Sequence, residues 1–141
     1  VFERLWQLAH DAPFIVKLTE APHYRRFVIE RKGREHAQTA HGGIGLAPQP
    51  VNSGKGFVFI DHVGNIMPSG FLPLVAGNVR CQGLAEVYRN SSLFADLRRP
   101  ERLKGRCGRC LYASECGGSR ARAYAASADA FAADPSCDYP V

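Results

Sequence analysis

The hydrophobic positions in the first part of the chain predict a helix, a strand and a second helix. Residues 2–10 carry apolar side chains at helical spacing. The apolar face of this helix consists of Phe2, Leu5, Trp6 and Ala9. Residues 14–18 form a short apolar run typical of a buried strand, and residues 23–35 are expected to begin as a helix that Gly33 weakens. Helix, strand and helix in this order indicate an α/β unit.

A stretch rich in glycine and proline separates this unit from the rest. Residues 36–56 lack a periodic apolar pattern and are expected to be a linker. Residues 57–60 are then typical of a strand, Gly64 and Asn65 supply turn residues, and Ile66 begins a return strand. The pattern therefore predicts a β-hairpin directly after a change of domain.

Short helices are predicted in the second half of the chain. Residues 84–89 and 92–98 each show helical spacing of apolar positions. Residues 119–132 are rich in alanine and contain neither proline nor glycine, which predicts the clearest helix of this half. Residues 134–135 are expected to end that helix.

Length and charge indicate one ordinary domain. The 141 residues are 45% hydrophobic and 22% charged. No segment reaches the about 20 apolar residues of a membrane span, so a soluble cytoplasmic protein with no membrane partner is expected. The net charge of +5 comes from scattered arginines, and the arginine-rich run at 98–109 lacks interleaved aromatic side chains, so nucleic acid is not the expected partner. Because the sequence opens on Val1 inside an amphipathic pattern, we expect it to be cut from a longer protein.

Cysteine usage changes this picture most. The chain has five cysteines, and four of them lie between Cys107 and Cys137. A secreted disulfide scaffold would usually carry an even count, so reduced, metal-binding thiols are expected. Cys107 and Cys110 have CxxC spacing, Cys116 follows after five residues, and Cys137 lies beyond the alanine-rich helix. This spacing predicts one four-thiolate metal site.

The residues alone leave two metals open. Structural zinc sites usually pair two CxxC knuckles, whereas the second half of this site is split across the alanine-rich helix, so a [4Fe-4S] cluster is preferred over zinc. Gly117 and Gly118 would let backbone amides face the sulfurs of a cluster. Nearby arginines that would stabilise thiolates are Arg106, Arg109, Arg120 and Arg122. Unrelated buried thiols are a further alternative, which a loop rich in glycine and arginine disfavours.

The cysteine region resembles the C-terminal SPASM/Twitch domain of radical S-adenosylmethionine enzymes, nearest the branch of heme and heme d1 biosynthesis. The resemblance is carried by the CxxCxxxxxC run, by the Gly-Gly-Ser-Arg that follows it, and by Asp-Pro-Ser-Cys at 134–137. It implies one auxiliary [4Fe-4S] cluster with four cysteine ligands. The implied ligands are Cys107, Cys110, Cys116 and Cys137.

The same resemblance implies the fold class and the domains. The expected fold is α+β, with the end of a partial (β/α)6 barrel followed by a β-hairpin and short helices around the cluster. Residues 1–35 would be the remnant of the barrel, residues 36–56 the linker, and residues 57–141 the auxiliary-cluster domain. Residues 57–73 resemble the hairpin of that family.

Two departures from the family pattern limit what this chain is expected to do. Full SPASM domains hold a second auxiliary cluster, but Ser69 and Arg120 stand at two of its ligand positions and Cys81 is one residue out of register. One cluster is therefore expected, with Cys81 as a structural thiol. The radical-generating CxxxCxxC motif is also absent from this sequence, so no catalytic residue is assigned and the chain alone is not expected to cleave S-adenosylmethionine.

The implied function is that of the C-terminal portion of a radical S-adenosylmethionine enzyme. Its auxiliary cluster would serve electron transfer or substrate positioning during the modification of a peptide or a tetrapyrrole. S-adenosylmethionine would be bound only by the full-length parent, and a ferredoxin or flavodoxin is the expected class of electron donor. The alternative is a zinc-stabilised four-cysteine binding module without a redox role.

Other titratable residues offer no catalytic set. His36 and His41 form a weak pair, and His62, like the other histidines, is expected on the surface or in a loop. Glu20 and His23 carry more weight, together with Arg25, because residues at the end of a barrel strand tend to face the site. That argument depends on the resemblance.

Overall fold

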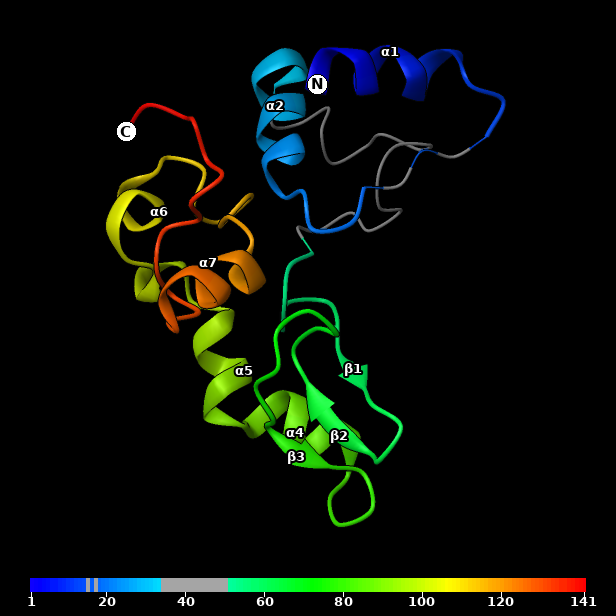
Figure 1. The fold of residues 1–141 in the computed structure, drawn as a ribbon, viewed down its shortest axis with the longest axis vertical. Coiled ribbons are helices and arrows are strands. Elements are labelled where there is room, and N and C mark those ends of the chain that lie inside the picture. The colour runs from blue at the N-terminus through cyan, green and yellow to red at the C-terminus, as the bar shows by residue number, and fades with distance from the viewer. Residues whose placement is uncertain (15, 17, 34–50) are drawn as a thin grey trace.

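The structure is a computed structural model that describes residues 1–14, 16, 18–33 and 51–141. Figure 1 shows three groups of elements along its longest axis. Helices α1 (Phe2–Asp11) and α2 (His23–Lys32) lie at one end, and a small sheet lies with α4 (Leu84–Asn90) at the other. The segments around α6 (Gly105–Arg109) and α7 (Arg120–Ser127), which carry the four clustered cysteines, lie between them and place the candidate site near the middle of the molecule.

Aromatic side chains join the two N-terminal helices. The ring of Phe2 packs against Tyr24 and Phe27, each at 5.7 Å between centroids, and Trp6 also meets Phe27. Glu3 forms an ion pair with Arg31 across the same contact. These contacts confirm the predicted apolar face of the first helix.

The predicted strand at 14–18 is not present in the described part of that run. Residues 15 and 17 lie outside the described residues, Val16 and Leu18 are not in a strand, and the Phe14 side chain is 62% exposed. No neighbouring strand among the described residues pairs with this run, so its backbone has no ladder to join. Of the predicted linker at 36–56, residues 36–50 lie outside the described residues, whereas residues 51–56 are described and contain a bridge between Asn52 and Lys55.

A three-stranded antiparallel sheet confirms the predicted hairpin and extends it. Strands β1 (Phe59–Ile60) and β2 (Asn65–Met67) pair with Phe59 opposite Met67. Gly64 supplies the turn with φ +92°, a conformation that favours glycine. A third strand, β3 (Gly77–Asn78), pairs with β2. The described residues therefore contain helices and a small antiparallel sheet, which agrees with the expected α+β class.

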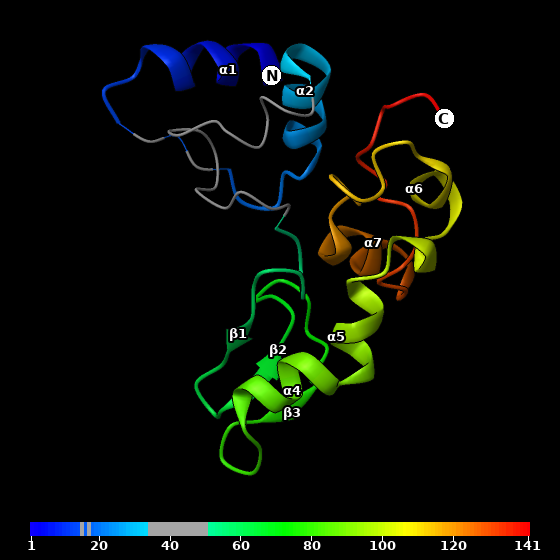
Figure 2. The same cartoon turned by 180° about the vertical axis from the view of Figure 1, so that it is seen from behind.

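One apolar core lies between the sheet and the next two helices. Phe94 of α5 (Ser92–Leu97) is fully buried against Ile66 of β2 and Val87 of α4. Ser91 caps α5 by accepting a hydrogen bond from the Phe94 backbone N–H, which fixes where that helix begins. Figure 2 shows α4 in front of the strands, where it covers one face of the sheet.

The alanine-rich helix is shorter than its sequence predicts. Helix α7 runs from Arg120 to Ser127, and the expectation that it continues to about Ala132 is wrong. Ala128 adopts a left-handed conformation, and the Ser127 hydroxyl bonds the Ala123 carbonyl within the last turn. The following turn places Ala130 against Leu72 in a second apolar cluster, so tertiary packing overrides helix propensity here.

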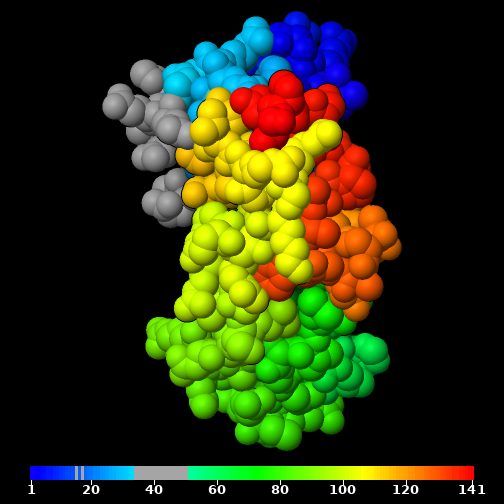
Figure 3. All heavy atoms as spheres, turned by 90° about the vertical axis from the view of Figure 1, so that its left-hand side faces the viewer, coloured from blue at the N-terminus to red at the C-terminus, as the bar shows by residue number. Residues whose placement is uncertain are grey.

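Two short helical segments precede the cysteine pocket. The first is η1 (Pro100–Arg102), and the second is α6 (Gly105–Arg109), which contains Cys107. The C-terminal tail beyond α7 then returns toward α2 (Figures 1 and 3). Arg26 of α2 stacks on the Tyr139 ring of this tail, at 4.5 Å from the ring centroid. None of the helices within the described ranges is long and apolar enough to span a bilayer.

The buried phenylalanine of α5 provides a test of the core. We expect Phe94→Ala to lower the free energy of unfolding by about 3–5 kcal/mol, because it removes a fully buried ring and leaves a cavity. Urea denaturation monitored by circular dichroism measures the loss. Phe71, which is 64% exposed, supplies the control, and Phe71→Ala should stay within about 0.5 kcal/mol of the wild type. Equal losses in the two variants would contradict this core.

Candidate metal centre

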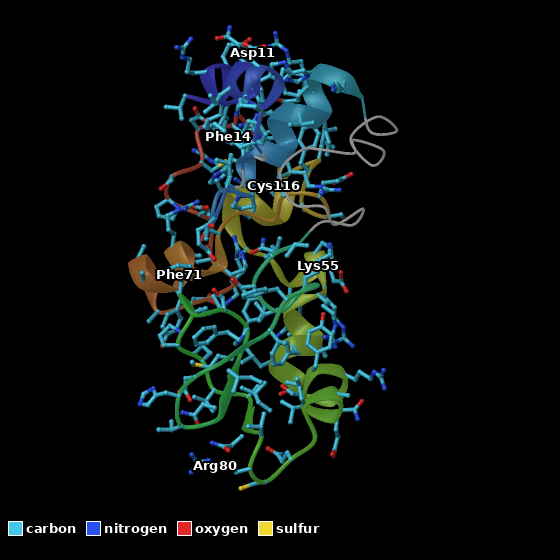
Figure 4. All side chains as sticks on the ribbon, turned by 90° about the vertical axis from the view of Figure 1, so that its right-hand side faces the viewer. Asp11, Phe14, Lys55, Phe71, Arg80 and Cys116 are labelled. Atoms are coloured by element: carbon cyan, nitrogen blue, oxygen red, sulfur yellow. The ribbon has the colours of Figure 1, made fainter. Side chains whose placement is uncertain are left out.

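The four cysteines expected to act as ligands line one pocket. Cys107, Cys110, Cys116 and Cys137 all face the same recess, which holds about 320 Å³ of open space including solvent at its mouth. In Figure 4, the labelled Cys116 lies between Phe14 and Lys55, in the middle of the molecule. Cys116 and Cys137, which the alanine-rich helix separates in the sequence, thus line the same pocket, as the sequence pattern predicts.

The CxxC pair is formed by a helical turn. Cys107 lies inside α6, and Cys110 is the residue directly after that helix. Gly108 is required between them because a Cβ at this position would lie 2.2 Å from the Leu103 carbonyl oxygen. The pair therefore depends on a close backbone approach that only glycine permits.

The loop at the third cysteine carries backbone amides toward sulfur. Gly117 and Gly118 have φ of +63° and +66°, and the Gly118 N–H donates to Cys116 Sγ at 3.5 Å. The side chain of Asn52 holds this loop, because its Nδ2 donates to the Cys116 carbonyl at 3.1 Å and to the Gly118 carbonyl at 2.8 Å. Residues at 51–56 thus take part in building the pocket.

Further donors point at the CxxC sulfurs. The backbone N–H of Tyr112 donates to Cys110 Sγ at 3.4 Å, and that of Asp134 donates to Cys107 Sγ at 3.4 Å. The Arg120 guanidinium also reaches Cys107 Sγ, at 3.6 Å. Hydrogen bonds of this kind stabilise thiolate and tune a metal bound to it.

Burial opposes ionisation of the thiols when no cation is bound. Cys107 and Cys116 are buried, whereas Cys110 and Cys137 are half-buried. Burial raises the pKa of Cys116 to about 11, the Gly118 N–H opposes that rise, and the neighbouring thiols Cys137, Cys107 and Cys110 increase it further. A cationic centre would reverse this balance, because metal ligation requires and stabilises thiolate.

The donor set suits an all-thiolate centre. Four cysteines, backbone N–H donors onto three of the sulfurs and two left-handed glycines are the groups that such a centre uses. Within the part of the chain that is described, no three His, Cys, Asp or Glu side chains form a group that could hold a single metal ion as they stand.

A buried carboxylate joins this pocket to the N-terminal helices. Asp134 Oδ2 accepts from the Ser119 N–H at 2.6 Å and from Arg122 Nη2 at 2.8 Å, and it lies 3.0 Å from His23 Nε2. The Asp134 carbonyl accepts from the Cys137 N–H. One residue thus contacts α2, the start of α7 and the backbone or sulfur of two pocket cysteines.

The ionised form of this carboxyl group is strongly favoured. Burial would raise the pKa of Asp134, but the contact with His23, the Arg122 guanidinium and the N–H groups of Ser119 and Ser136 outweigh it. The net result is a pKa well below the usual range of aspartate. The group therefore carries its negative charge throughout the neutral range.

A second carboxylate belongs to the same network. Glu20 Oε2 accepts from the Ser119 hydroxyl at 2.5 Å, and the Glu20 carbonyl accepts from Arg122 Nη1 at 2.6 Å. Glu20 has φ +55°, which is uncommon for a residue with a side chain, and these bonds hold it there. Glu20 and His23 therefore join the polar network beside the pocket, but neither lines the pocket itself. The expectation of a surface position for His23 is wrong because it is 6% exposed.

The residues at the positions of a second cluster have other roles. Ser69 is buried, and its hydroxyl accepts from the Phe71 N–H and donates to Glu20. Arg120 is 2% exposed and lies beside the pocket. Cys81 is exposed, so the expectation that it is a structural thiol is wrong. His36 and His41 lie outside the described residues.

Comparison with known proteins identifies related chains. No family model matches this sequence. AdoMet-dependent heme synthase of Methanosarcina barkeri is 39% identical over 137 residues, which cover 95% of this chain and 39% of that protein. The enzyme of the same name from Nitratidesulfovibrio vulgaris is 40% identical over 88% of this chain and 34% of its own length. Pre-heme d1 synthase of Dinoroseobacter shibae is 37% identical over 72% of this chain and 26% of its own length.

This chain is related to the heme and heme d1 branch of radical S-adenosylmethionine enzymes. The resemblance inferred from the cysteine region is thereby confirmed. The chain spans less than two-fifths of the length of the curated relatives it matches.

Sequence reasoning missed two residues that build the pocket. Asn52 falls in the glycine-rich stretch interpreted as a linker, and Asp134 is expected to end a helix and to belong to the Asp-Pro-Ser-Cys motif but not to hold the pocket. The signal for Asp134 is its position three residues before Cys137 in Asp-Pro-Ser-Cys. Nothing in the spacing of Asn52 reveals its contact, because its partners lie more than sixty positions away.

The buried carboxylate can be tested against an exposed one. We expect Asp134→Ala to lower the free energy of unfolding by about 3–5 kcal/mol at neutral pH, since it leaves the Arg122 guanidinium without its buried counter-ion and removes the carboxylate beside His23. Asp138, whose side chain is 93% exposed, is the control, and Asp138→Ala should change stability by about 0.5 kcal/mol or less. Urea denaturation measures both.

The pH dependence of that loss has a definite sign. The pKa of Asp134 is lower in the folded chain than its unfolded value of 3.8. The stability it contributes is therefore full above the unfolded pKa and is lost as the pH falls toward the folded pKa. The gap between wild type and Asp134→Ala should shrink below about pH 4. A gap that is constant down to pH 2 would contradict this role.

Proposed function

We propose that this chain is the auxiliary-cluster portion of a radical S-adenosylmethionine enzyme that modifies a tetrapyrrole. Cys107, Cys110, Cys116 and Cys137 would each ligate one iron of a single [4Fe-4S] cluster. The observation that carries the proposal is the meeting of these four thiols at one pocket with N–H donors onto three of the sulfurs.

The ligand set favours electron transfer. When bound, such a cluster accepts or donates one electron, and with four cysteine ligands it has no open position for substrate. The half-buried Cys110 and Cys137 lie on the accessible side of the pocket, which shortens the distance to a partner. A ferredoxin or flavodoxin is the proposed class of donor.

The substrate class follows from the names of the relatives. Heme synthase and pre-heme d1 synthase act, by their names, in the formation of tetrapyrroles. A tetrapyrrole is therefore favoured over a peptide as the substrate of the whole protein. Since this chain lacks CxxxCxxC, the radical would be generated by another part of that protein, which would also bind S-adenosylmethionine. Residues 1–35 would be the end of its barrel, and residues 57–141 the auxiliary domain.

The role of the remaining pocket residues is to hold the thiols and limit solvent access. Asn52 and the paired glycines fix the loop of Cys116. Tyr112 packs edge-on against Tyr139 at 5.5 Å between ring centroids, next to the C-terminal ligand. Packed rings beside a centre of this kind reduce its hydration.

Metal content provides the first test. Protein purified without oxygen should be brown and contain iron and sulfide in equal amounts, and Cys116→Ser should lose most of both because it removes a buried ligand. Cys81→Ser is the matched control and should retain them, since Cys81 is exposed and distant from the pocket residues. Colourless protein containing stoichiometric zinc would replace this proposal by the zinc-stabilised binding module.

Turnover of the full-length protein provides the second test. We expect Cys116→Ser in that protein to cleave S-adenosylmethionine at the normal rate while forming at least tenfold less tetrapyrrole product, a loss of about 1.4 kcal/mol or more of transition-state stabilisation. Chromatography of 5′-deoxyadenosine and of porphyrin products measures the two rates. Unchanged product formation after verified loss of the cluster would refute an electron-transfer role.

A further inference from the structure

Arg120 places a fixed positive charge inside the protein. Its side chain is 2% exposed. The guanidinium donates from Nη1 to the carbonyls of Ala130 and Ala132, each at 2.9 Å, and from Nε to the Gly118 carbonyl at 3.3 Å. Three neutral acceptors thus orient the group, and its planar fork cannot rotate without breaking them.

The charge of this guanidinium has no ion-pair partner on any described carboxylate. Its remaining contact is with Cys107 Sγ, at 3.6 Å from Nη2. The carboxylate of Asp129 interacts electrostatically with this guanidinium without forming an ion pair, but a buried charge whose hydrogen-bond partners are all neutral is strongly unfavourable. The guanidinium points toward the pocket of four cysteines. When those cysteines are thiolates that bind a metal centre, they supply the negative charge that this cation lacks.

The absence of a side chain at Gly118 allows the Arg120 guanidinium to approach Cys107 Sγ. A Cβ at Gly118 would lie 2.8 Å from Arg120 Nη2 and 3.1 Å from Cys107 Sγ. Only glycine therefore leaves room for the guanidinium to reach the sulfur. The Asp134 N–H contacts the same sulfur, so Cys107 receives two donors on one side.

We propose that Arg120 is a positioning residue that raises the reduction potential of the proposed cluster through Cys107. This inference rests on the proposed function. Reduction adds one electron, and hence one negative charge, to the cluster and its ligands. A fixed cation in a water-poor site stabilises the reduced form more than the oxidised form, and hydrogen bonds to ligand sulfur act in the same direction.

The experiment compares midpoint potentials in the anaerobic protein. Dithionite titration followed by electron paramagnetic resonance gives the potential of wild type, Arg120→Gln and Arg120→Lys. We expect Arg120→Gln to have a lower potential than wild type, and Arg120→Lys to restore part of the difference because it keeps the charge without the fork geometry.

Arg98 offers a matched control. It also donates to two backbone carbonyls, those of Tyr88 and Arg89, but among the described residues it makes no hydrogen bond with a cysteine. Arg98→Gln should leave the midpoint potential unchanged. An equal shift in Arg98→Gln and Arg120→Gln would overturn the specific role of Arg120.

The outcomes separate this inference from the proposed function. Absence of iron and sulfide in the wild type would refute the cluster itself. Full iron and sulfide with an unchanged potential in Arg120→Gln would overturn only the role of Arg120. If the Arg120 variants lose the cluster, pulsed electron paramagnetic resonance of reduced wild type labelled with ¹⁵N-arginine decides. Arg26 and Arg106 also line the pocket, so a hyperfine coupling to guanidinium nitrogen that survives in both Arg26→Gln and Arg106→Gln supports the proposal, and no arginine coupling in the wild type overturns it.

Discussion

The buried carboxylate of Asp134 is the interaction on which the rest of the site depends. It receives the N–H that begins α7 and the guanidinium of Arg122, and it lies beside His23 of α2. The backbone of the same residue donates to Cys107 Sγ and accepts from the Cys137 N–H. The positions of Cys107 and Cys137, the first and last of the four pocket cysteines in the sequence, are therefore coupled to the packing of the N-terminal helices.

This coupling explains how a small structure keeps four thiols together. The described strands contain few residues, and the apolar clusters are modest, so burial alone gives limited rigidity. Polar bonds supply the rest: Asn52 holds the loop of Cys116, and Glu20 binds Ser119 across ninety-nine positions of sequence. A buried polar network of this kind fixes geometry when its members are satisfied. Arg120 adds a buried positive charge to this network, beside Cys107 of the pocket.

Local patterns in the sequence predicted what depends on local chemistry. The first helix, the hairpin turn at Gly64 and the capped helix at Ser92 follow from spacing and turn residues that act within a few positions. The meeting of the four cysteines was also predictable from the sequence. The CxxC spacing places two thiols on one turn, and the segment after the alanine-rich helix brings Cys137 back toward them. The length of α7 did not, since Ala130 gains more from packing against Leu72 than from continuing the helix.

Long-range polar contacts were beyond the reach of the sequence. Nothing in residues 14–18 shows that the run lacks a strand partner among the described residues, and nothing near His23 shows that it meets a carboxylate more than a hundred positions away. Such pairs depend on the whole fold being in place. The family resemblance, confirmed by the heme and heme d1 relatives, identified the region but not the bonds that hold it.

Native mass spectrometry of the anaerobic protein tests the central claim most directly. The account predicts that each chain carries a mass increment of one [4Fe-4S] unit, and that this increment disappears when any of Cys107, Cys110, Cys116 or Cys137 is replaced by alanine. An increment of one zinc ion, or a full iron–sulfur increment in those variants, would contradict it.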